Sequence, residues 1–240
     1  MKWLKIVCLA KSRKNQGYCI AGKIITSKKW IRAISGRKTE ELIGRECKLN
    51  INREVEVLDI VEIPVIEHKP NEFQFENFLI NDRWNWKYIE EFNYNDLKNL
   101  CDYPKDLWLI KNCSDCSSSS GENDRVPEKE AKRFKESLYF ITPDTLKLFV
   151  RTEYRDTTFQ KKRLRAEFSY RGIKYILSVT DIYLEKIFLK DEEAIYEIKK
   201  PKHKIYMCVS LGLPYKGYCY KFVSSILPSK KVLKEFKKLK

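Results

Sequence analysis

Histidine is almost absent from this chain, with 2 in 240 residues, His68 and His203. Neither lies in a recognisable catalytic dyad, and the sequence holds no G-x-S-x-G, P-loop or H-E-x-x-H pattern. The case for an enzyme is therefore thin, and we expect no catalytic activity. The alternative left open is a nuclease that holds one magnesium ion through scattered acids such as Glu62, Asp124 and Asp181.

Long apolar runs are also missing. The chain begins Met1-Lys-Trp-Leu-Lys-Ile-Val-Cys-Leu-Ala-Lys11, in which lysines interrupt the stretch that a signal peptide would need. No later segment approaches the length of a membrane span. We therefore expect a cytoplasmic protein that has no membrane partner.

Metal-binding cysteine pairs are scarce, although the chain has 8 cysteines. One C-x-x-C is present, Cys113-Ser-Asp-Cys116, whereas a structural zinc site usually needs two such pairs. A polar surface loop is the better interpretation, because the serine run 117–120 follows directly. We expect no metal site and no cofactor, and the cysteines in apolar segments should be reduced core residues.

Positive charge is what the chain has in excess, and this charge is unevenly distributed. The formal net charge is +15. Residues 1–50 hold 13 Lys and Arg against 3 Asp and Glu, residues 51–150 hold 13 against 20, and residues 151–240 hold 22 against 10. A codon bias towards lysine would raise the total without sorting it by segment. The basic ends therefore predict a surface that attracts nucleic acid, and the acidic middle is a candidate docking segment for a protein partner.

A cysteine–glycine phrase occurs twice, once near each end. Cys8 to Cys19 and Cys208 to Cys219 both have the form C-x8-G-Y-C, and each copy lies between short apolar runs. The pattern is typical of a strand, a tight turn and a second strand. It predicts two related small β units, with recurring turn chemistry as the alternative explanation.

Alternating and β-branched segments predict a mainly β fold. The candidate strands are residues 3–9, 18–25, 29–34, 55–66, 138–141, 146–150, 164–170 and 174–180. Pro64 should place the fourth of them at a sheet edge or a strand end. We expect two small OB-like barrels with a helical insertion in the middle, α+β overall, and a single larger sandwich is the alternative.

Helical segments are expected mainly in the middle of the chain. Large apolar residues in 84–100 recur at nearly helical spacing, and Pro127 is well placed as the first residue of a short helix. The expected divisions are a first OB-like unit (1–83), an acidic helical and loop insertion (84–136), a second OB-like unit (137–229) and a basic tail (230–240).

Several phrases together resemble the dual OB-containing domain family. They include Lys5-Ile-Val-Cys-Leu-Ala-Lys-Ser-Arg-Lys14, Gly17-Tyr-Cys-Ile-Ala-Gly22, Trp30-Ile-Arg-Ala-Ile-Ser35, Leu177-Ser-Val-Thr-Asp181 and Gly217-Tyr-Cys-Tyr-Lys221. The match runs from about residue 4 to about residue 227, in family order. The resemblance implies two OB folds, nucleic-acid binding and a place in prokaryotic defence, and it carries over no catalytic residue.

OB-type modules hold single strands with cationic side chains for phosphates and aromatic rings for bases. The candidates near the amino terminus are Lys11, Arg13, Lys14, Tyr18, Trp30 and Arg32. The candidates further on are Asn123, Asp124, Arg125, Arg163, Arg165, Tyr175, Asp181, Tyr218 and Tyr220. Each has a structural alternative: the rings as core residues, the lysines as a solvated turn, Asp124 as a helix cap and Asp181 as a strand end.

The sequence therefore predicts a non-catalytic protein that binds single-stranded DNA or RNA. Two other functions stay open. One is a sensor that holds a nucleotide-sized signal in a cleft between two barrels. The other is a subunit of a defence system that binds a partner protein.

Overall fold

The computed structural model describes residues 2–153, 160–190, 193–197, 204–227 and 237–239. The chain forms two compact units. Unit 1 comprises Met1–Cys101 with Lys135–Leu138, and unit 2 comprises Asp102–Phe134 with Tyr139–Lys240. The middle of the chain is therefore divided between the two units, whereas the sequence predicted a separate insertion over 84–136.

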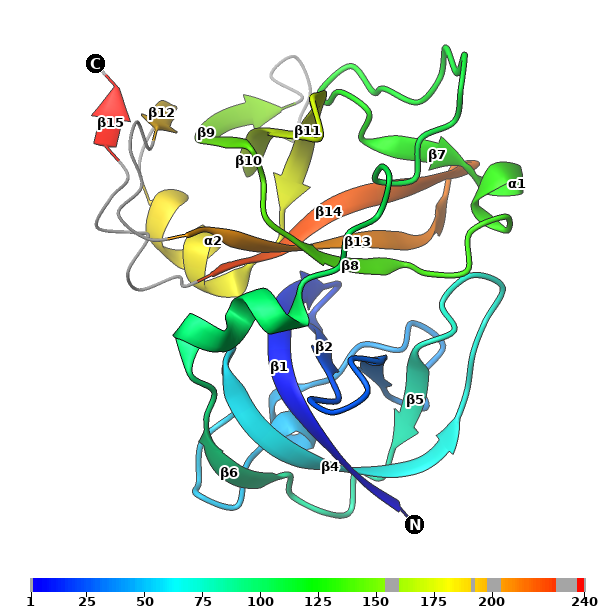
Figure 1. The fold of residues 1–240 in the computed structure, drawn as a ribbon, viewed down its shortest axis with the longest axis vertical. Helices are drawn as coiled ribbons and strands as arrows, with labels where there is room; N and C mark the ends of the chain where they lie inside the picture. The colour runs from blue at the N-terminus through cyan, green and yellow to red at the C-terminus, as the bar shows by residue number, and fades with distance from the viewer. Residues whose placement is uncertain (1, 154–159, 191–192, 198–203, 228–236, 240) are drawn as a thin grey trace. The chain divides into compact units, whose positions relative to one another are not determined.

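Unit 1 is a closed five-stranded barrel (Figure 1). Its strands are β1 (Lys2–Lys14), β2 (Gly17–Lys23), β3 (Trp30–Ile34), β4 (Asp59–His68) and β5 (Asn77–Ile80). They follow the order β1-β2-β3-β5-β4, and β4 returns to pair with β1. β3 and β5 run parallel and the other pairs are antiparallel. This is a small Greek-key barrel of the OB type.

Apolar side chains that alternate along the strands fill the interior of this barrel. Ile6, Ile20, Ile31 and Val61 are buried members of one hydrophobic cluster inside it. The remaining elements of unit 1 are the 3-10 helices η1 (Gly44–Cys47) and η2 (Tyr94–Leu100) and the strand β6 (Lys87–Glu91), which extends the sheet beside β4. On β2 and β3 the side chains that alternate with these core residues point outwards, to the face where an OB fold binds its ligand.

Unit 2 holds one sheet with the order β15-β12-β9-β10-β11-β14-β13-β8, and β7 pairs with β14. Its strands are β7 (Arg125–Pro127), β8 (Leu138–Ile141), β9 (Thr145–Glu153), β10 (Lys161–Tyr170), β11 (Ile173–Val179), β12 (Ala194–Glu197), β13 (Tyr206–Tyr215), β14 (Tyr218–Leu227) and β15 (Lys237–Leu239). Its helices are α1 (Glu128–Ala131) and α2 (Ile182–Phe188).

The strand order of unit 1 recurs in unit 2. The series β9-β10-β11-β14-β13 repeats β1-β2-β3-β5-β4, and β11 runs parallel to β14 as β3 does to β5. In unit 1 the single strand β1 pairs with both β2 and β4. In unit 2 two consecutive segments divide that role, because β9 pairs with β10 and β8 pairs with β13. Pro143, between them, cannot donate a backbone hydrogen bond.

The C-x8-G-Y-C phrase, in contrast, lies in non-equivalent hairpins. The first copy turns between β1 and β2 through Asn15-Gln16, and the second turns between β13 and β14 through Lys216-Gly217. A Cβ on Gly17 would lie 2.3 Å from the carbonyl oxygen of Leu42, whereas Gly217 is required by its φ of +82°. The units are related by strand order, and the phrase reflects recurring turn chemistry.

Several local predictions need correction. Residues 84–100 contain the strand β6 before η2, because β6 pairs with β4. Pro64 lies inside β4, which has partners on both sides. On one side β1 places Trp3 opposite Pro64, and on the other side pairing with β6 ends at Glu62 and pairing with β5 begins at Val65. The helix after Pro127 is only four residues long.

The predicted basic tail lies mostly outside the described residues, and its part 237–239 is a strand beside β12. Among the residues described, none of the helices has the length and apolar character needed to cross a membrane.

Candidate nucleic-acid interface

OB folds bind oligonucleotides on the outer face of their second and third strands and with the loops that join strands 1–2 and 4–5. In unit 1 these elements are β2, β3, the turn 15–16 and the loop 69–76. In unit 2 the described elements at these positions are β10, β11 and the turn 216–217, and the connection between β9 and β10 lies mostly outside the described residues. Each copy of the C-x8-G-Y-C phrase therefore contains a loop with which OB folds bind ligands. In unit 1 this is the loop between strands 1 and 2, and in unit 2 it is the loop between strands 4 and 5.

The outer face of β2 and β3 in unit 1 is not open to solvent. Lys23 is fully buried and Arg32 is 2% exposed. The ammonium of Lys23 donates to the carbonyl oxygen of Leu100, at 2.8 Å. A face whose cations are buried and paired has little to offer to a phosphate.

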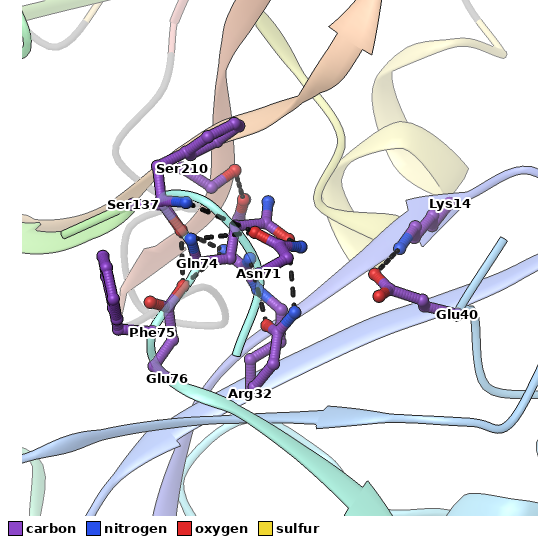
Figure 2. Close-up of polar contacts among 12 residues, drawn as sticks. Lys14, Arg32, Glu40, Asn71, Gln74, Phe75, Glu76, Ser137 and Ser210 are labelled. Carbon is purple, nitrogen blue, oxygen red and sulfur yellow. Dashed lines mark hydrogen bonds and ion pairs between the residues drawn. The ribbon is translucent and has the colours of Figure 1, made fainter. Parts of the chain in front are cut away.

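Arg32 is the centre of a buried network in unit 1 (Figure 2). Its Nη2 lies 3.0 Å from Oε1 of Glu76 and donates to Oγ of Ser137 at 2.9 Å. The Ser137 hydroxyl in turn donates to the Glu76 carboxylate, and the backbone N–H of Arg32 donates to the carbonyl oxygen of Glu76. These contacts fasten the loop before β5 to β3, so Arg32 serves the fold rather than a surface site.

Trp30, two residues earlier, shares the outer face of β3 but is only half-buried. The Lys23 ammonium lies 4.9 Å from the centre of its ring. Its ring is not part of the barrel core. The stacking role predicted for Trp30 stays a prediction.

The β1–β2 hairpin carries the predicted amino-terminal cations, and two of them are already paired. Lys11 forms an ion pair with Glu54 and lies 4.5 Å from the ring centre of Tyr18. Burial and the nearby Glu54 carboxylate raise the pKa of Tyr18. Lys14 reaches Glu40 at 3.4 Å (Figure 2), whereas Arg13 is exposed. The hairpin therefore offers less positive charge than its sequence suggests.

Unit 2 presents a mixed basic and aromatic row on its outer face. Cross-strand pairing places Phe149 of β9 opposite Arg165 of β10, Arg165 opposite Ser178 of β11, and Ser178 opposite Phe222 of β14. The residues alternate with buried core positions such as Leu164. Phe149 and Phe222 are half-buried, so part of each ring reaches solvent. Arg165 itself is 4% exposed, so the cations that a single strand would need beside these rings must come from neighbouring residues.

Three arginines converge beside this row on the carboxylate of Glu153. Arg165 Nε lies 2.7 Å from Oε1, Arg163 Nε lies 2.8 Å from Oε2, and Arg151 Nε lies 3.9 Å from Oε1. Arg151 also donates to the carbonyl oxygen of Ser120 at 2.7 Å. The side chains of Arg151 and Arg163 are 37% and 33% exposed, and those of Arg165 and Glu153 are 5% and 3% exposed. We call Arg151, Arg163, Arg165 and Glu153 the arginine cluster.

A second basic–aromatic contact lies on β14 and β7. The guanidinium carbon of Arg125 is 4.0 Å from the ring centre of Tyr218, and Arg125 Nε donates to the carbonyl oxygen of Asp115. Tyr218, Tyr220 and Phe222 share one face of β14 by alternation, and all three are half-buried. The predicted Tyr218 and Tyr220 thus continue towards the aromatic row, and Tyr215 in the same hairpin is 61% exposed.

Besides Arg32 and Arg165, three further predicted site residues are buried and have structural partners. The hydroxyl of Tyr175 accepts from the N–H of Leu107, its ring stacks on Phe168, and burial raises its pKa to about 12. Asp181 caps α2 by accepting from Leu184 N–H.

Asp124 accepts from the N–H and hydroxyl of Ser118, and therefore fastens the preceding loop rather than capping a helix. Beside it, Asn123 is half-buried and donates to the carbonyl oxygen of Lys174. Tyr175, Asp181 and Asp124 are therefore not offered to a ligand at the surface.

The described part of the chain contains no group of three His, Cys, Asp or Glu side chains placed to hold a metal ion. Of the acids considered for a nuclease, Glu62 belongs to unit 1, and Asp124 and Asp181 belong to unit 2. Cys113 and Cys116 are joined by a disulfide, although the sequence predicted a plain polar loop there.

Sequence reasoning missed Phe149, Arg151 and Phe222. Phe222 continues the alternation of Tyr218 and Tyr220, and that signal was present in the sequence. Phe149 and Arg151 become informative only once β9 is in register with β10, which places Arg151 opposite Arg163. No feature of the isolated β9 segment shows this pairing.

A closed barrel in unit 1 and a sheet in unit 2 with the same order of five strands are consistent with two OB domains in one chain. A family model described as the dual OB-containing domain matches residues 4–226. The chain therefore belongs to this family, as its sequence phrases suggested, and the OB fold is one that binds nucleic acid in many proteins. No curated protein matches the chain in sequence.

Proposed function

We propose that this protein binds single-stranded nucleic acid without strong sequence preference, through the outer face of β9, β10, β11 and β14, and without chemistry on the bound strand. The observation that carries the proposal is that Arg151 and Arg163, whose side chains are 37% and 33% exposed, lie on the same outer face as the half-buried rings of Phe149 and Phe222. Cations would hold phosphates there while rings stack on bases, and neither contact depends on base identity. A place in prokaryotic defence stays an expectation from the family.

The distribution of charge favours this surface of unit 2, rather than the β1–β2 hairpin of unit 1, as the binding site. Lys11 and Lys14 are neutralised one-to-one by Glu54 and Glu40. In the arginine cluster, three guanidinium groups share one carboxylate, so the cluster keeps a net charge of +2. Binding of a polyanion is driven by release of its counterions to such unneutralised charge.

Fluorescence anisotropy with a labelled single strand of about a dozen bases tests the proposal. With several phosphate contacts, the logarithm of the association constant should fall by about 0.7 per contact for each unit of log salt concentration. The double variant Arg151→Gln/Arg163→Gln should weaken binding and flatten the salt dependence. Lys11→Gln/Lys14→Gln removes the same formal charge from paired sites and is the matched control.

Two outcomes would contradict the proposal. A salt-independent affinity would favour a small-ligand site over an extended interface. Cleavage of the labelled strand in the presence of magnesium ions, absent from a matched mock purification, would replace binding by a nuclease activity.

A further inference from the structure

The arginine cluster has the composition of a discrete oxyanion site. All three arginines approach Glu153 through Nε, and for Arg163 and Arg165 this distance is below 3 Å. A guanidinium is planar, so an arginine that meets a carboxylate through Nε still has terminal nitrogens on its other edge. Arg151 uses one of these on Ser120. The cluster therefore has donors beyond those that Glu153 satisfies.

One of these donors is buried without an acceptor. Nη1 of Arg165 is shielded from solvent and has no hydrogen-bond partner in the described part of the chain, and the whole residue is 4% exposed. Leaving a buried guanidinium N–H unsatisfied is costly, because the group has lost water without gaining a partner. The partly exposed guanidinium groups of Arg151 and Arg163 are the ones that an oxyanion can reach first. The buried Nη1 of Arg165 would gain an acceptor only if these neighbours move aside as the oxyanion binds.

Charge selects the class of oxyanion. The cluster carries a net +2, from three guanidinium groups and one carboxylate. A phosphodiester inside a strand carries one negative charge, whereas a phosphomonoester carries about −1.5 to −2 at pH 7. The monoester is the better match. Phe149 lies opposite Arg165, and we expect its ring to stack on the first base attached to such a phosphate.

We propose that the arginine cluster binds a terminal phosphate, so that the protein prefers a phosphorylated strand end over an internal stretch of strand. This inference rests on the proposed function, since it assigns the end of the ligand to a particular place on the same surface. The chemistry shared by the possible ligands is the phosphomonoester of a 5′ end, a 3′ end or a free nucleotide.

The test compares one oligonucleotide sequence with a 5′-phosphate, a 3′-phosphate or hydroxyls at both ends, at low and physiological salt. We expect one phosphorylated form to bind about tenfold more tightly than the hydroxyl form. A nucleoside monophosphate, added as competitor, shows whether the terminal nucleotide alone occupies the site. The preference should shrink between pH 7.5 and 5.5, because the second ionisation of a monoester has a pKa of about 6.

Arg163→Gln should abolish the preference, because Arg163 is partly exposed and its loss leaves a net +1. Arg171→Gln is the matched control: it removes one positive charge from the exposed turn after β10 and should keep the preference. Arg165→Met gives a second test, with circular dichroism to establish that the variant is folded.

The outcomes are distinguishable. Equal affinity for phosphorylated and hydroxyl ends, with salt-dependent binding retained, overturns this inference and leaves the proposed function standing. Absence of binding to every oligonucleotide overturns both. If the free nucleotide binds tightly and the strand does not bind, the phosphomonoester site stands and its ligand is a nucleotide. The proposed function in binding a strand is then overturned.

Discussion

The guanidinium of Arg32 lies 3.0 Å from the carboxylate of Glu76, and both side chains are buried. Both residues belong to unit 1, so the pair joins β3 to the end of the loop before β5. In an OB fold this loop and this strand are positions where a ligand is expected. The pair shows that here they are used to hold the barrel together.

Breaking this pair should destabilise the protein without affecting its ligand. Arg32→Ala leaves the Glu76 carboxylate buried and uncompensated, which costs about 3–5 kcal/mol in the free energy of unfolding. Oligonucleotide affinity should stay unchanged where the variant is folded. Chemical denaturation and anisotropy on the same samples measure the two quantities.

The double variant Arg32→Met/Glu76→Leu is the control, because it removes both charges together. Replacing a buried pair by apolar residues of similar volume is often close to neutral. A stable Arg32→Ala variant that binds the oligonucleotide more weakly would show that Arg32 contacts the ligand and would contradict this prediction.

Lys221 should make stability depend on pH. It is 1% exposed, its ammonium has no hydrogen-bond partner in the described residues, and burial lowers its pKa to about 7. Between this value and about 10.4 in the unfolded chain, the unfolded state binds more protons than the folded state. Stability therefore rises with pH across that window, at up to about 1.4 kcal/mol per pH unit.

Lys221→Met removes this contribution. The variant should be more stable than the wild type at pH 7, and the difference should shrink towards pH 10. Urea denaturation at pH 7, 8.5 and 10 measures it. A difference that does not change with pH would show that Lys221 stays protonated in the folded state over this range, with a pKa close to that of the unfolded chain.

The contribution of Asp181 should make the free energy of unfolding change with pH in the opposite direction, and at lower pH. Burial raises its pKa to about 6, although the N–H groups of Leu184 and Ile226 donate to its carboxylate. Between about 4 and about 6 the folded chain holds this proton more tightly than the unfolded chain, so stability falls as pH rises through that window.

In Asp181→Asn the titration is gone. The unfolding free energy of the wild type minus that of the variant should therefore decrease from pH 4 to pH 6 and stay constant above pH 6. A difference that grows over this range would mean that the folded state favours the ionised carboxylate.

Much of the fold could be predicted, because alternation and turn residues are local signals. Eight strands and the two OB-like units followed from them. The strand β6 was taken for a helix, since its exposed residues do not alternate and its strand character comes from pairing with the distant β4. The break at Pro143 was predicted as two separate strands, but the pairing of β8 with β13 and of β9 with β10 has no local signature.

The site was harder to predict, for a physical reason that Arg32 and Arg163 illustrate. Alternation tells which residues share a face, but not whether distant segments cover that face. Arg32 was correctly placed on the outside of β3, yet Ser137, more than 100 residues later, helps to bury it. Arg163 lies on a face that stays accessible, and its partner Glu153 could be assigned only from the β9–β10 register.

The location of the interface is the central claim, and photo-cross-linking measures it directly. A single strand carrying 4-thiouridine at successive positions is bound, irradiated and digested with the protein, and the cross-linked peptides are identified by mass spectrometry. We predict cross-links in β9 and β14, at Phe149, Tyr220 and Phe222. Cross-links confined to the β1–β2 hairpin and Trp30 would contradict the account and place the interface on unit 1.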